Sequence, residues 1–108
     1  MSSSVKVNMR VCGKVHIIEV SALPDGNYSI KAVTECDHVR EFVEMVNPLS
    51  ITDLTDKSQS KVWEAVKTSH MSATCLVPAA IMNAGWMEAG LLSKNLARGA
   101  GNNSIDFV

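Results

Sequence analysis

The chain has few of the features that mark nucleic-acid-binding proteins. Its 10 Lys and Arg residues stand against 11 Asp and Glu, so the formal net charge is -1 and no broad positive field attracts phosphate groups. Aromatic residues make up only 5% of the 108 residues, which leaves few side chains on which bases could stack. We therefore expect no nucleic-acid partner.

Long apolar runs are also missing. The most apolar stretch, residues 75–92, is interrupted by a proline, an asparagine, glycines and a glutamate, so it is not expected to cross a membrane. Residues 1–5 contain no basic segment leading into an apolar one, and no signal peptide is expected. These absences predict a soluble, cytoplasmic protein without membrane contact.

Cysteine is scarce as well. The chain has 3 cysteines, an odd number, and no pair stands at Cys-x-x-Cys spacing. An odd count in a chain without an export signal argues against a disulfide framework. Free thiols remain, and each is either a small buried hydrophobe or part of a site.

In the first third of the chain, apolar and polar residues alternate with a period of two. This pattern predicts strands over residues 4–11, 14–20 and 28–33. Cys12-Gly13 interrupts the alternation once, and a turn at Asp25-Gly26 interrupts it again because both residues tolerate positive φ. The three strands are expected to form an antiparallel meander.

The spacing of apolar residues then changes to that of helices. A first helix is expected between a capping box, with Thr34 as N-cap and Asp37 reaching back, and the stop at Asn47-Pro48. A second lies within residues 56–70, and a third runs from Pro78 to about residue 92. The residues expected to face the core are Val39, Phe42, Val43, Val46, Val62, Trp63, Val66, Ile81, Met82 and Trp86.

This order predicts a single α+β domain over residues 1–108, with three helices on one face of the meander. Its core is expected to span about residues 5–92. Residues 93–108 are expected to be a flexible linker that can add an edge strand at 104–108. Small residues in the helix over 78–92 permit close packing, so a homodimer through this helix is expected.

The three cysteines fall at positions that packing alone does not explain. Cys12 lies in the break between two strands, Cys36 in the first turn of a helix, and Cys75 just before the helix that begins at Pro78. Helix N-termini stabilise a thiolate over a thiol through their free N–H groups and positive dipole end. These positions predict a three-thiol metal site.

The histidines supply candidates for a fourth ligand. His70 ends the second helix shortly before Cys75 and would complete a Cys3His set. His38, Asp37 and water remain open as alternatives to it. His16 alternates within a strand and is expected to face solvent, without a metal role.

The order of these pieces resembles that of the iron–sulfur cluster scaffold proteins IscU and the N-terminal domain of NifU. The resemblance rests on "VCGKVHIIEV", "PDGNYSIKAVTEC" and "SHMSATCLVPAAIMNA", and it covers roughly residues 11–90. It implies the scaffold fold and ligation of zinc or an iron–sulfur cluster by the three cysteines. The "CLVPAAI" piece also resembles a small family of bacterial and archaeal proteins that share a CxVPxAI segment.

The chain departs from the scaffold pattern at several positions. Lys14 stands where the scaffolds have an aspartate, and Glu35 and Asp37 flank Cys36 in place of a glycine. The scaffold histidine and third cysteine are adjacent, whereas His70 and Cys75 are separated. The resemblance therefore implies the fold more strongly than the activity.

Three functions follow from these observations. The first is a scaffold or carrier that binds a metal or an iron–sulfur cluster through the three cysteines. The second is a thiol-based sulfur carrier or redox protein, and the third is a small interaction domain whose cysteines are structural. No His–Asp–Ser set, phosphate loop or carboxylate pair predicts an enzyme.

Overall fold

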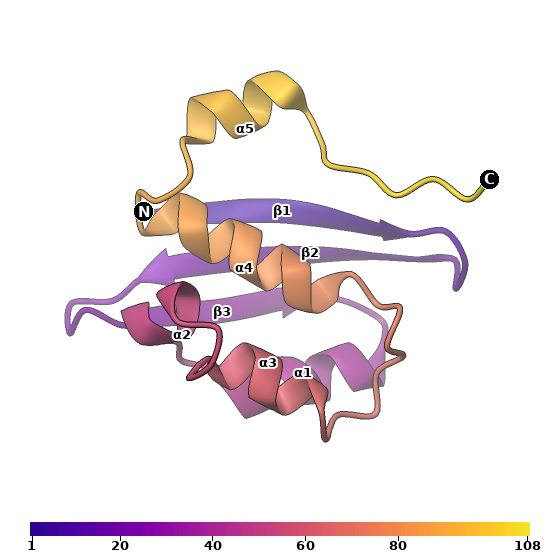
Figure 1. Cartoon of the computed structure of the whole chain (residues 1–108), viewed down its shortest axis with the longest axis horizontal. Coiled ribbons are helices and arrows are strands. Elements are labelled where there is room, and N and C mark those ends of the chain that lie inside the picture. The colour runs from indigo at the N-terminus through magenta and orange to yellow at the C-terminus, as the bar shows by residue number, and fades with distance from the viewer.

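Alternating side chains and tight turns fold the first third of the chain into a three-stranded antiparallel sheet. The computed structural model covers residues 1–108, and Figure 1 shows helices on one face of the sheet. The strands are β1 (Ser2–Met9), β2 (Lys14–Ala22) and β3 (Tyr28–Val33), in the order β1-β2-β3. The helices are α1 (Asp37–Val46), α2 (Ile51–Thr55), α3 (Lys61–Val66), α4 (Val77–Glu88) and α5 (Lys94–Ala100). The predicted α+β class and the meander are confirmed.

The central strand β2 has the opposite phase to the one predicted. Its inward residues are His16, Ile18 and Val20, whereas Val15 is 51% exposed. The prediction that His16 faces solvent is therefore wrong. Apolar residues stand on both sides of this strand, so its own sequence does not decide which side faces the core. Pairing with β1 decides it, because His16 lies opposite Val7, and only one side of β1 is apolar.

Helix α1 begins later than the capping box predicted. Its N-cap is Cys36, and the Thr34 hydroxyl accepts a hydrogen bond from the Cys36 N–H at 3.0 Å instead of capping the helix. Asp37 pairs with Arg40 rather than reaching back to the N-cap. The apolar stripe of this helix is confirmed, since Val39, Phe42, Val43 and Val46 are all buried.

Buried Asp53 connects the starts of two short helices. Its carboxylate accepts from the Ser50 N–H at 2.8 Å, while the Ser50 hydroxyl accepts from the Asp53 N–H at 3.2 Å, which makes a capping box on α2. The second carboxylate oxygen accepts from the Lys61 N–H at 2.9 Å, at the first residue of α3. One side chain thus fixes α2 and α3 relative to each other.

Helix α4 packs across β1 and β2 with Pro78 in its first turn, as predicted. It ends at Glu88 rather than near residue 92, because Gly90 adopts a positive φ of 76° that stops the helix. Its small residues Ala84 and Gly85 are buried inside the chain, and a Cβ on Gly85 would lie 2.5 Å from Leu54 Cδ2. Close packing within the chain, against β1, β2 and α2, therefore uses these residues.

Both tryptophans lie at the surface rather than in the core. Trp63 is 36% exposed and Trp86 is 39% exposed. Ala65 and Met87 take the buried positions beside them. The prediction that the tryptophans anchor the core is therefore wrong.

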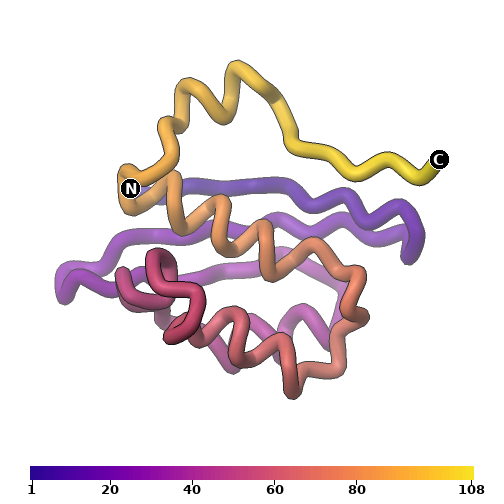
Figure 2. Tube along the Cα trace, viewed as in Figure 1, coloured from indigo at the N-terminus to yellow at the C-terminus, as the bar shows by residue number.

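A buried carboxylate joins the start of the chain to its last helix. Glu88 accepts from the Ser3 hydroxyl at 2.9 Å and from the Ala22 N–H at 3.0 Å, and Lys94 lies 3.5 Å from it. The Lys94 amine also donates to the Ser2 carbonyl at 3.3 Å, so β1 begins beside the end of α4 (Figure 2). We call this set the Glu88 clamp.

The last part of the chain differs from the linker that was expected. Residues 94–100 form α5, capped by the Ser93 hydroxyl, which accepts from the Leu96 N–H at 3.2 Å. Residues 101–108 form no regular element, so the predicted edge strand at 104–108 is absent. None of the five helices is long and apolar enough to cross a membrane.

Asp53→Asn should lower the free energy of unfolding by about 1 to 3 kcal/mol at neutral pH, because buried N–H groups lose a charged acceptor. Burial by itself raises the pKa of Asp53, but the hydrogen bonds from Ser50 and Lys61 outweigh it and hold the pKa below its ordinary value. This stabilisation is present above about pH 4 and is lost as the pH falls through the lowered pKa of the folded state. Urea unfolding of both proteins at neutral pH and at about pH 3 measures it.

The difference between Asp53→Asn and the unchanged protein should shrink at the lower pH. Asp106→Asn is the matched control, because Asp106 is exposed and outside every helix and strand. Equal destabilisation by Asp53→Asn at both pH values would contradict the account of this carboxylate.

Gly85→Ala should destabilise the protein by about 1 to 3 kcal/mol, because the added methyl group overlaps the fully packed Leu54 side chain. Gly99→Ala in α5 is the matched control, since a Cβ there meets nothing within 4 Å. This control should be neutral or stabilising by up to about 1 kcal/mol. Thermal unfolding followed by circular dichroism distinguishes the two, and similar melting temperatures for both variants would refute the close approach of Leu54.

Candidate thiol site

The three cysteines come from three separate segments that meet at one end of the sheet. In an antiparallel meander, the first and third strands run in the same direction, so the turn after β1 and the end of β3 lie at the same end of the sheet. Figure 1 shows that α4 also begins at this end. Cys12 lies in the β1–β2 turn, Cys36 is the N-cap of α1, and Cys75 precedes α4. All three are free thiols.

The thiols differ in how they are held. Cys12 is exposed, and its thiol makes one long hydrogen bond, donating to the Met9 carbonyl at 3.7 Å. Cys36 and Cys75 are partly buried and pack against the hydrophobic core. Two sulfurs are therefore positioned by packing, whereas the third sits on an exposed turn and can rotate without breaking the core.

Cys75 is the thiol whose ionisation the surroundings affect most clearly. Burial raises the pKa of Cys75, the backbone N–H of Val77 at the start of α4 opposes this, and the charges of Cys12 and Cys36 raise the pKa further. A bound cation would relieve this repulsion.

His70 does not join the thiols. Its Nδ1 lies 2.9 Å from Glu41 Oε1 of α1, and its side chain is 72% exposed. Its ring centroid lies 6.0 Å from that of His38. The contact with Glu41 attaches the segment that carries Cys75 to the helix that Cys36 begins.

Asp37, another candidate for the fourth ligand, is already engaged. A hydrogen bond from Arg40 and the charge of that residue lower the pKa of the Asp37 carboxyl. Arg40 also donates to the Thr34 carbonyl, so it holds both sides of the α1 start. No group of three or more His, Cys, Asp or Glu side chains is arranged to hold a metal ion in this structure.

The donor set therefore fits a soft metal by its chemistry, but the side chains are not preassembled around one. Zn–S bonds of about 2.3 Å require the three sulfurs to converge. Cys12 is exposed, so its side chain can change conformation without disturbing the core.

Two residues at this end of the sheet, His16 and Thr34, make a contact that the sequence pattern does not predict. His16 is 1% exposed on the inward side of β2, and its Nδ1 lies 2.7 Å from the Thr34 hydroxyl. The signal was available in β1, because an inward Val7 paired with β2 puts His16 on the same face. The capping pattern predicts that the Thr34 hydroxyl caps a helix, whereas in the structure this hydroxyl contacts His16.

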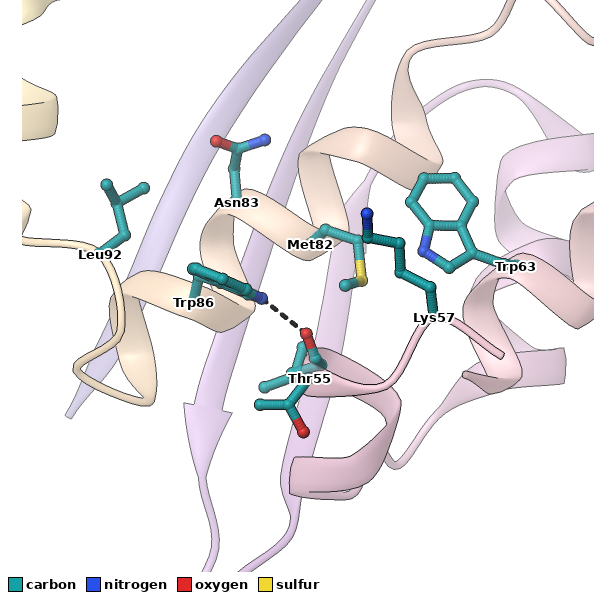
Figure 3. Close-up of a pocket in the computed structure, with 8 residues that line it drawn as sticks. Thr55, Lys57, Trp63, Met82, Asn83, Trp86 and Leu92 are labelled. Atoms are coloured by element: carbon teal, nitrogen blue, oxygen red, sulfur yellow. Dashed lines mark hydrogen bonds between the residues drawn. The ribbon is translucent and has the colours of Figure 1, made fainter. Parts of the chain in front are cut away.

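A separate groove lies between α4 and the connection from α2 to α3 (Figure 3). It has a volume of about 270 Å³, and the Lys57 side chain extends between the two indole rings. The Trp86 Nε1–H donates to the Leu54 carbonyl at 2.7 Å. None of the cysteines lines it. Its lining is Leu54, Thr55, Lys57, Trp63, Met82, Asn83, Trp86 and Leu92.

The part of the chain that carries these features matches a known family. A family model matches residues 3–99 of the chain. The chain belongs to DUF6951, a family of unknown function. The DUF6951 match runs from β1 into α5 and includes all three cysteines, His16 and His70.

No curated protein and no solved structure matches the chain. Membership of DUF6951 names no activity, so the function has to be argued from the thiols themselves. The likeness to the IscU and NifU scaffolds remains a prediction made from the order of the sequence motifs.

In the reduced, metal-free DUF6951 protein, alkylation should modify Cys12 first and Cys75 last. Cys75 should react several-fold more slowly than Cys12, because burial restricts access to its sulfur and also raises its pKa, which lowers the fraction of reactive thiolate. Timed iodoacetamide labelling followed by peptide mass spectrometry gives the three rates. The same labelling in urea is the control, where the three rates should converge. Equal rates for Cys12 and Cys75 in the folded protein would show that the two environments are not different.

Proposed function

We propose that this DUF6951 protein is a scaffold or carrier that binds zinc or an iron–sulfur cluster through Cys12, Cys36 and Cys75. The observation that carries the proposal is that three free thiols stand on distant segments that the topology brings to the same end of the sheet. Thiolates are the ligands that zinc and iron–sulfur clusters prefer. A reducing cytoplasm, the compartment proposed for this protein, would keep these thiols available.

Some groups around the thiols would support bound thiolates, although burial raises the pKa of Cys75 in the metal-free protein. Cys36 caps α1 without a hydrogen bond from its own side chain, so its sulfur is free to ligate. The Val77 N–H favours the thiolate of Cys75. Lys14 acts on both Asp37 and His16 and therefore brings a positive charge to the same end.

Three protein thiols leave one coordination position open. An open position suits a carrier, because a partner or an acceptor protein can supply the last ligand during transfer. His70 stays a candidate for this position, although it would have to leave Glu41. Water and His38 remain the alternatives.

Thiol chemistry without a metal is the second candidate. It is favoured by the absence of a preassembled group of metal ligands and by the position of Cys36 at a helix N-terminus. Here Cys36 would act as a nucleophilic thiolate in sulfur carriage or redox sensing. The metal content and the thiol reactivity of the purified protein distinguish the two candidate functions.

Protein purified without oxygen should contain about one zinc ion per chain, or one cluster of two or four iron atoms per chain or per pair of chains. Elemental analysis together with a visible absorption spectrum measures this. Each of C12S, C36S and C75S should weaken Co²⁺ binding by about 100-fold or more, because each removes one thiolate ligand. Thiolate-to-cobalt charge transfer bands give the affinity directly.

Asp106→Asn is the control for these titrations and should bind cobalt as the unchanged protein does. A protein that binds no metal, with one thiol of lowered pKa, would replace the metal proposal by thiol chemistry. Full cobalt affinity in the triple Cys→Ser variant would refute both the site and its ligands.

A further inference from the structure

A histidine in the core stands beside the thiol site without having been assigned any role. His16 is 1% exposed and shares the inward face of β2 with Ile18 and Val20, which are fully buried. A valine or isoleucine could fill this position without the loss of imidazole hydration. The presence of a polar ring here therefore calls for a partner that uses it.

That partner is Thr34, and through it Cys36. His16 Nδ1 lies 2.7 Å from Thr34 Oγ1, and the same oxygen accepts the Cys36 N–H at 3.0 Å. The Thr34 hydroxyl has one proton to donate, and Nδ1 is the acceptor in reach. We therefore assign His16 as the neutral tautomer with its proton on Nε2, which agrees with the lowered pKa that burial and Lys14 give it.

We propose that His16 is a positioning residue of the thiol site, which holds the Cys36 backbone in place through the Thr34 hydroxyl. The expected effect of His16 on metal binding rests on the proposed function, whereas its expected effect on the reactivity of the Cys36 thiol does not. Residues that orient a ligand without touching the metal commonly change metal affinity by 10- to 100-fold.

The geometry at the start of α1 explains why this bond matters. Cys36 adopts an extended conformation as N-cap, and its side chain makes no capping hydrogen bond. Its N–H is therefore held by the Thr34 hydroxyl, and its carbonyl by the Arg40 N–H at 3.1 Å. Removing the hydroxyl would free the Cys36 backbone. The Cys36 sulfur would then be less well placed to share a metal with Cys12 and Cys75. His16 belongs to β2, so it sets this residue relative to the sheet.

Thr34→Val and Thr34→Ser test the relay as a matched pair, because the first removes the hydroxyl at constant shape and the second keeps it. Thr34→Val should weaken Co²⁺ binding by about 10- to 100-fold and Thr34→Ser by less than about threefold. In metal-free protein, Thr34→Val should change the alkylation rate of Cys36 by at least about threefold, with the rate of Cys12 unchanged. If Thr34 only filled space, Thr34→Ser would not keep both the cobalt affinity and the Cys36 alkylation rate of the unchanged protein.

His16→Leu and His16→Gln repeat the test from the other side and serve if Thr34→Val does not fold. Glutamine retains an oxygen that can accept from Thr34, so His16→Gln should stay close to the unchanged protein, whereas His16→Leu should behave as Thr34→Val does. Unchanged cobalt affinity and an unchanged Cys36 rate in folded Thr34→Val or His16→Leu would overturn the inference. If the unchanged protein binds no metal, the proposed function fails, and the Cys36 rates alone decide the role of His16.

Discussion

The burial of one face of β2 is the constraint on which the other features of this protein depend. Ile18 and Val20 have no exposed surface, and α4 lies across them. A strand with one buried face cannot slip by one residue without bringing its outward side chains into the core. The buried faces of β1 and β2 therefore fix their common register, and the pairing of Val7 with His16 turns His16 inward.

This constraint also determines which segments lie at the same end of the sheet. Because the meander is antiparallel, the β1–β2 turn that carries Cys12 and the exit from β3 toward Cys36 lie at one end, and α4 starts at that end as well. The cysteines themselves add little to the core, since Cys12 is exposed and the other two are only partly buried. The placement of the three segments at one end is thus a property of the topology, which the apolar core maintains.

Local patterns predicted the parts of the fold in which one periodicity dominates. Residues 28–33 became β3 and the stripe from Val39 to Val46 became the buried side of α1, because neither segment has a competing apolar phase. Predictions failed where a tertiary partner decides: His16 is inward because of Val7, and Thr34 bonds His16 instead of capping α1. The shared site of the three thiols stays a prediction, whereas the His16–Thr34 contact could be found only from the strand register.

The Glu88 clamp has a practical consequence for attachment to this protein. Since the clamp places Ser3 against the end of α4, whatever is joined ahead of β1 emerges at the end of the sheet opposite the thiols. A label, an immobilising tag or a preceding domain at that position leaves the cysteine end facing outward. The start of the chain and the cysteines thus lie at opposite ends of the sheet, so that measurements on the thiols of surface-tethered protein can be oriented through the first residue.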